Sequence, residues 1–256
     1  MKKVGTKSDA PLIGESELRT RDFVCEKTGK KFTGEQTKIF ESWFPVHKFH
    51  PDIVEQQFQE HERQQKEERR LRNLESWRAE CPKIFQETDI DRLDSKSCAS
   101  VFDRQFESMV IHGVTGSGKT RIMWELLRRQ LGSMKLGGRG WCFISSRKLA
   151  DELGDAVFRN QHEQVIQKYQ RIRFLMIDDV GKETMTKRWA TDFFEIIDIR
   201  TSMKRQTIFS TNYTGQKFVN KFATIDEELA QATNRRIKEF FANVNFVTKV
   251  DNQTKN

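Results

Sequence analysis

The sequence feature that most constrains the fold is a glycine-rich segment at residues 113–120, which reads Gly-Val-Thr-Gly-Ser-Gly-Lys-Thr. It matches the pattern G-x-x-x-x-G-K-T and lies between an apolar run at 108–112 and a helical pattern from Arg121 onward. Glycines let the main chain wrap around a polyphosphate, so that successive N–H groups and the following helix N-terminus face the anion. The segment therefore predicts binding of a nucleoside triphosphate.

Two residues of this loop have predicted chemical roles. Lys119 is expected to reach the β- and γ-phosphates, and the Thr120 hydroxyl is expected to bind Mg²⁺. A glycine-rich turn that matches by chance is the alternative, but the flanking strand and helix patterns argue against it. The predicted nucleotide-binding residues are Gly113, Val114, Thr115, Gly116, Ser117, Gly118, Lys119, Thr120 and Arg121.

Polar side chains end two further apolar runs. The run at 173–177 is followed by Asp178 and Asp179, and the run at 206–211 is followed by Asn212. Asp178 is expected to hold Mg²⁺ through water, and Asp179 to orient or deprotonate the attacking water. Because ligands lie at the carboxyl ends of parallel strands, the Asn212 amide would position that water near the γ-phosphate. Solvated acids and a turn asparagine are the structural alternatives.

From residue 101 onward, short apolar runs alternate with helical patterns, which is typical of a parallel sheet with crossover helices. Strands are expected near 108–112, 140–145, 172–177, 206–211 and 244–249. Helices are expected near 118–131, 146–169, 187–203 and 226–240. The predicted fold class is α/β, with a five-stranded parallel sheet.

The first third of the chain has a different pattern. An aromatic-rich segment at 23–49 precedes a long charged helix at 52–80, whose only apolar end is formed by Leu71, Leu74 and Trp77. This helix is either a solvated connector or an arm that docks on a partner. We expect residues 1–81 to form a smaller, mostly helical partner-binding region and residues 82–256 to form the nucleotide-binding domain.

Charge and cysteine content restrict the partners and the compartment. Residues 1–100 contain 19 Lys+Arg and 19 Asp+Glu, so the net charge of +8 lies entirely in residues 101–256. Such an excess suits a polyanionic partner such as nucleic acid, although ordinary surface solvation is the alternative. The four cysteines form no C-x-x-C pair, and there is no secretory leader pattern and no run of 18 apolar residues. A cytoplasmic protein without membrane association is therefore expected.

Arginines near the end of the chain are candidates for an intersubunit role. Arg235 and Arg236 lie on the helix expected before the last strand. An arginine there can point toward the nucleotide of a neighbouring subunit and stabilise transition-state charge. Simple solvation of the pair is the alternative, and Arg200 is a weaker candidate for the same interface.

The motifs together resemble the AAA+ ATPases of the DnaC-type helicase-loader and IstB-type transposition-helper group. The resemblance is carried by the phosphate loop, Ile-Asp-Asp-Val-Gly at 177–181, Ser-Thr-Asn at 210–212 and Asn-Arg-Arg-Ile-Lys-Glu at 234–239. It covers roughly residues 82–250, because 82–88 are similar to the segment that leads into these ATPase domains. It implies an ATPase using ATP and Mg²⁺, with Arg236 acting in trans within a homo-oligomer. A short polar tail, 251–256, follows the last strand, and no C-terminal helical lid is expected.

This resemblance implies an ATP-dependent loader of a replicative DNA helicase, which assembles on single-stranded DNA through its ATPase domain. An IstB-type helper of transposition is the alternative; a small-molecule kinase and a non-hydrolysing ATP-binding adaptor are further candidates. Family resemblance also places single-stranded DNA on the helical insert at 145–170, with Arg147, Lys148, Phe158, Arg159 and Lys168. Phe158 is at helical spacing from Leu149 and Leu153, so we expect it in the core rather than stacked on a base.

Overall fold

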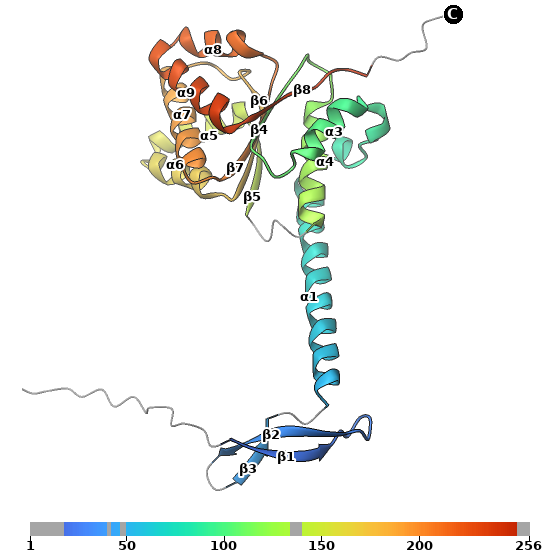
Figure 1. Ribbon diagram of the computed structural model, residues 1–256. Coiled ribbons are helices and arrows are strands. Elements are labelled where there is room, and N and C mark those ends of the chain that lie inside the picture. Colours follow the sequence, from blue (N-terminus) through green and yellow to red (C-terminus); the bar gives the residue numbers. More distant parts are fainter. Residues whose placement is uncertain (1–17, 40–41, 47–49, 134–139, 250–256) are drawn as a thin grey trace, which may run out of the picture. The chain divides into compact units, whose positions relative to one another are not determined.

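The computed structural model describes residues 18–39, 42–46, 50–133 and 140–249 (Figure 1). The chain divides into two compact units, residues 1–67 and 68–256. The division falls inside the long helix α1, Pro51–Glu80, rather than at the expected boundary after residue 81. The last turns of α1 therefore belong to the second unit.

The first unit contains a small antiparallel sheet that we did not predict. Its strands are β1 Leu18–Val24, β2 Lys31–Ile39 and β3 Ser42–Pro45, in the order β1-β2-β3. Phe23 lies opposite Phe32 in the register, and their rings stack at 5.6 Å. The Arg19 guanidinium lies 4.1 Å from the centre of the Trp43 ring. The aromatic residues noted in the sequence thus hold the sheet together through cross-strand pairs.

The second unit contains the predicted five-stranded parallel sheet. Its strands are β4 Met109–His112, β5 Trp141–Ser145, β6 Phe174–Val180, β7 Gln206–Thr211 and β8 Ala242–Asn245. They are ordered β5-β6-β7-β4-β8, and every neighbouring pair is parallel. The predicted α/β fold with a parallel sheet of five strands is confirmed.

Helices connect these strands, with two differences from the prediction. Before the sheet lie α2 Lys83–Gln86, a 3-10 turn at Ile90–Arg92 and α3 Ser95–Asp103. The crossover helices are α4 Lys119–Gly132, α5 Ser146–Phe158, α6 His162–Arg171, α7 Lys187–Ser202, α8 Gly215–Ala223 and α9 Glu227–Phe240. The expected helix at 146–169 is thus two helices, and α8 was not predicted. Between β8 and residue 249 no further helix occurs, and the tail at 251–256 lies outside the described residues.

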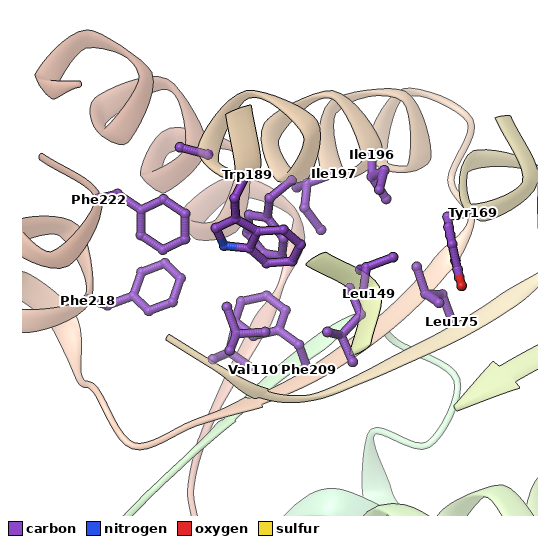
Figure 2. Packing of buried hydrophobic residues seen from close by; sticks show 14 of the residues in the cluster. Val110, Leu149, Tyr169, Leu175, Trp189, Ile196, Ile197, Phe209, Phe218 and Phe222 are labelled. Atoms are coloured by element: carbon purple, nitrogen blue, oxygen red, sulfur yellow. The ribbon is translucent and has the colours of Figure 1, made fainter. Parts of the chain in front are cut away.

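Hydrophobic clusters cover both faces of the sheet, because alternate strand residues point to opposite sides. Ile111 packs with α3, α4 and the end of α1, where the buried Trp77 donates a hydrogen bond from Nε1 to the Trp124 carbonyl oxygen at 3.0 Å. Val110 packs in the opposite cluster, with residues from α5 to α9. Figure 2 shows aromatic side chains of this second cluster, including Trp189 and Phe209. The sheet is therefore the middle layer of an α/β/α sandwich.

Phe158 is not a core residue, so that prediction was wrong. Its side chain is 89% exposed, whereas Leu149 and Leu153 are buried. At 3.6 residues per turn, a residue five positions after Leu153 is rotated by about 140° around the helix axis. Phe158 also ends α5, and Asn160 adopts a positive φ of 54° in the turn that follows. The side chain therefore points away from the sheet.

Arg200 is fully buried, which excludes the surface role that we considered for it. Its guanidinium donates hydrogen bonds to Thr207 Oγ1 and to the carbonyl oxygens of Tyr169, Gln170, Ile172 and Gln206. Burial lowers the pKa of Arg200 to about 9, so the group is still charged at neutral pH. Arg200 thus joins the end of α6 to the start of β7, and Arg205 donates a second hydrogen bond to the Gln170 carbonyl oxygen at 2.6 Å.

None of the helices in the described part of the chain combines the length and apolarity needed to cross a bilayer.

Candidate nucleotide-binding site

The strand order brings the three predicted polar segments together. β7 lies between β4 and β6, and all three strands run in the same direction. The loop after β4, the acids at the end of β6 and Asn212 after β7 therefore share one edge of the sheet. Ligands bind at this carboxyl edge in α/β proteins, near the point where the strand order reverses.

The loop after β4 has the backbone conformation of an anion-binding turn. Gly116 and Gly118 adopt φ values of 83° and 99°, which side-chain-bearing residues rarely adopt, and α4 begins directly afterwards at Lys119. A Cβ on Gly113 would lie 2.1 Å from the main-chain oxygen of Phe246, so no larger residue fits there. The sequence pattern of the loop is therefore explained by its geometry.

Lys119 lies at the centre of the loop and is only 5% exposed. Its Nζ donates hydrogen bonds of 2.9 Å to the carbonyl oxygens of Gly113 and Val114 and to Asn212 Oδ1. Burial lowers the pKa of Lys119 below its usual range, while the negative charges of Asp179 and Asp178 oppose that fall. The structure thus places Lys119 and Asn212, which are far apart in sequence, in direct contact.

Thr120 and Asp178 form a second contact between the loop and β6. Thr120 Oγ1 donates to Asp178 Oδ2 at 2.9 Å, and Ser210 Oγ donates to Asp178 Oδ1 at 2.5 Å. Burial raises the pKa of Asp178 above its ordinary value, and the hydrogen bond from Ser210 acts against this rise. A hydroxyl and a carboxylate side by side are oxygen donors of the kind that Mg²⁺ prefers. These two residues could hold such an ion.

Asp179 lies in an irregularity of β6. The register against β7 shifts between Ile177 and Val180, and Asp179 has a positive φ of 60°. Its N–H donates to Ser210 Oγ and its carbonyl oxygen accepts from Ser146 Oγ, both at 2.8 Å. Neighbouring residues of a regular strand point to opposite faces, whereas a bulge re-aims a side chain. Asp178 and Asp179 can therefore both serve the same site.

A cavity of about 200 Å³ lies where these groups meet. Its lining comprises Phe85, Thr115, Gly116, Gly118, Lys119, Thr120, Arg121, Asp179, Lys182 and Asn212. The Arg121 guanidinium donates to the Ile84 carbonyl oxygen at 2.8 Å and lies 5.5 Å from the centre of the Phe85 ring. Ser117 Oγ is buried in the loop and has no hydrogen-bond partner among the residues that the structure describes, which suits a loop built to receive a polar ligand.

Some residues of the site had no role in the sequence analysis. Ser146 and Ser210 fix the two acids, Phe85 lines the cavity, and Lys182 pairs with Asp179 at 2.7 Å. Ser210 could have been suspected, because it stands two residues before Asn212 on the strand that enters the site. Nothing in the spacing of Ser146 or Lys182 indicated their contacts.

The two arginines of α9 are absent from the lining of this cavity. Arg236 Nε pairs with Asp198 Oδ1 of α7 at 2.5 Å, and both side chains are partly exposed. Arg235 is exposed and makes no ion pair or side-chain hydrogen bond with the described residues. Neither arginine therefore serves the cavity of its own chain here.

A protein-family model described as IstB-like ATP binding protein matches residues 45–248. The chain belongs to this family. The resemblance inferred from the motifs is therefore confirmed, and ATP is the nucleotide that the cavity is expected to bind. The site geometry agrees with this, because its glycine turns, buried lysine and hydroxyl–carboxylate pair suit the phosphates of a nucleoside triphosphate.

Two curated relatives of this IstB-family protein come from different biological settings. One is an ATP-binding protein of insertion sequence IS232 from Bacillus thuringiensis, 30% identical over 158 residues, which are 56% of this chain and 61% of that protein. The other is the replicative helicase loader DnaC of Escherichia coli K12, 26% identical over 144 residues, which are 55% of each protein. The matches thus span little more than half the length of these relatives.

Solved structures share the fold of the second unit. A crystal structure of DnaI has a TM-score of 0.54 at 16% identity, and the match covers 66% of this chain and 95% of the chain in that structure. The AMPPCP-bound DnaA of Aquifex aeolicus has a TM-score of 0.51 at 16% identity, and the match covers 66% of this chain and 51% of the chain in that structure. These similarities show that the second unit shares its fold with DnaI and DnaA, and the family match supports an ATPase.

Proposed function

We propose that this protein is a Mg²⁺-dependent, cytoplasmic ATPase that loads a replicative DNA helicase onto single-stranded DNA as a homo-oligomer. The observation that carries the hydrolytic part is the hydrogen-bonded network around Asp178. In this network Thr120 and Ser210 bind its two carboxylate oxygens, and Ser210 also accepts the N–H of Asp179. One network thus joins the loop, the proposed metal-binding acid and the proposed base.

Five side chains of the site have a role in this proposal. Thr120 and Asp178 would hold Mg²⁺, and the bound ion would neutralise negative charge on the phosphates. Lys119 and the main-chain N–H groups of the loop would hold the phosphates. Asp179 would orient or deprotonate the attacking water, and Asn212, whose Oδ1 already contacts Lys119 Nζ, would help to position it.

The exposed aromatic side chain at the end of α5 supports the DNA-binding part. Phe158 is followed by the exposed Arg159, and Arg147 and Lys148 are exposed at the other end of the same helix. An aromatic ring beside cations suits a single strand, because bases stack on the ring while cations neutralise phosphates. Such contacts would be tolerant of sequence.

Phe158→Ala is expected to lower the affinity for a thymidine oligonucleotide by about 5- to 150-fold. Stacking of one base on an aromatic ring contributes about 1–3 kcal/mol. The free energy of unfolding should change little because the ring is exposed. Fluorescence anisotropy at one fixed salt concentration would measure this, with Met203→Ala, an exposed apolar residue at the end of α7, as the control. Equal affinity of the Phe158 variant and the wild type would exclude stacking on this ring.

The second candidate function, an ATPase helper of transposition, is favoured by the 30% identical relative from an insertion sequence. The two functions differ in partner and in DNA form. The full-length protein should form an ATP-dependent complex with the replicative helicase of its own genome, detectable by size-exclusion chromatography, and should bind single strands more tightly than duplex. Binding to a transposase with a preference for duplex DNA would replace the loader proposal with the helper function.

A further inference from the structure

Lys182 is a cation of the site that no motif identified. It lies in the turn after β6, where its N–H donates to the Asp179 carbonyl oxygen at 3.1 Å. Its side chain folds back over the same turn, and Nζ lies 2.7 Å from Asp179 Oδ2. The Lys182 side chain is 46% exposed, and its ammonium group is held by this ion pair.

Lys182 lines the same cavity as Lys119, Thr120 and Asn212. Its charge also acts on the groups at the centre of the site. Burial is the main cause that lowers the pKa of Lys119, and the nearby charge of Lys182 lowers it further. The charge of Lys182 likewise opposes the burial that raises the pKa of Asp178. Lys182 is therefore an electrostatic member of the nucleotide cavity.

The contact between Lys182 and Asp179 is suited to exchange. The main chain of Asp179 is fixed by Ser210 and Ser146, whereas among the described residues its carboxylate pairs with Lys182 alone. A lysine ammonium on a flexible, partly exposed stem can move from one oxygen anion to another with little cost. A triphosphate brings such oxygens into the cavity. Its terminal phosphate offers the ammonium group charged oxygen atoms that a diphosphate lacks.

We propose that Lys182 reads the terminal phosphate of the bound nucleotide. In the presence of a triphosphate its ammonium group contacts that phosphate and releases the Asp179 carboxylate, whereas with a diphosphate it stays on Asp179. This inference rests on the proposed nucleotide-binding function of the same cavity. It gives the site a residue within the same chain that distinguishes ATP from ADP and couples this distinction to the proposed base.

Equilibrium binding of nucleotides tests this role without any turnover. Lys182→Met is expected to weaken binding of a non-hydrolysable ATP analogue by about 10-fold, which corresponds to one charge-assisted hydrogen bond, while ADP affinity changes less than about 2-fold. Isothermal titration calorimetry of full-length protein with Mg²⁺ would measure both. Lys217→Met, at an exposed position on α8, is the matched control and should bind both nucleotides as the wild type does.

The outcomes separate this inference from the proposed function. Equal weakening of analogue and ADP binding, or no change in either, would overturn the phosphate-reading role of Lys182. Lys119→Ala, measured in parallel, tests the cavity itself. If Lys119→Ala loses both nucleotides while Lys182→Met loses neither, only the inference on Lys182 fails. If Lys119→Ala binds both nucleotides normally, the proposed nucleotide site fails as a whole.

Discussion

Asp179→Asn is expected to slow ATP hydrolysis by about 10²- to 10⁴-fold, the range contributed by a positioned general base. Binding of ATP should change little, because Asp179 is not among the groups that are proposed to hold the phosphates or Mg²⁺. Asparagine has nearly the same shape and keeps an oxygen that can accept from Lys182, so the turn at the end of β6 should persist. Phosphate release under steady state and equilibrium binding of ATP, measured on the same preparation, would establish both parts.

Asp155→Asn is a suitable control for this substitution. Asp155 is an exposed acid on α5 that is absent from the lining of the nucleotide cavity. The control should hydrolyse ATP at the wild-type rate. If Asp179→Asn also hydrolyses ATP at the wild-type rate, water activation by Asp179 is excluded, and another group must activate the water. If it loses ATP affinity as well, Asp179 holds the nucleotide rather than the water.

The arrangement of the phosphate loop, Asp178 and Asn212 could be predicted because it follows from few rules. Apolar runs that alternate with helices indicate a parallel sheet, and in such a sheet all strand ends of one kind lie at one edge. Polar residues directly after the runs then lie at this edge, and they come into contact because β7 lies between β4 and β6. The observed contacts of Lys119 with Asn212 and of Thr120 with Asp178 are what this reasoning leads one to expect.

Other features depend on local geometry that spacing does not encode. The register shift at Asp179 inserts a residue into β6 without any glycine or proline to mark it, although it determines where the carboxylate points. Arg200 looks like a surface arginine in the sequence, because its acceptors are main-chain carbonyl groups contributed by distant segments. The β1–β3 sheet was missed because its strands mix charged and apolar residues, and cross-strand pairs such as Phe23 and Phe32 become evident once the strands are paired.

The two arginines of α9 differ in the contacts that they make within their own chain. Sequence resemblance favoured Arg236 as the arginine that acts on a neighbouring subunit. The structure engages Arg236 with Asp198 of its own chain, whereas Arg235 is exposed. Moving Arg236 to another anion would first break this ion pair, but Arg235 has no such contact to lose among the described residues. We therefore propose Arg235 as the arginine that reaches the nucleotide of a neighbouring copy.

Arg235→Ala is expected to reduce ATP hydrolysis of the assembled protein by about 10³- to 10⁵-fold, the effect of removing an arginine supplied in trans. Arg236→Ala, the matched control, should lose only a partly exposed ion pair worth less than about 1 kcal/mol of stability. A mixture of Arg235→Ala and Lys119→Ala proteins should recover hydrolysis, because the second variant can offer its intact Arg235 to the intact loop of the first. Phosphate release by each variant and by the mixture measures this. If the mixture does not recover ATP hydrolysis, action of Arg235 in trans is excluded. If Arg236→Ala loses more ATP hydrolysis than Arg235→Ala, the role belongs to Arg236, and Asp198 is its positioning partner.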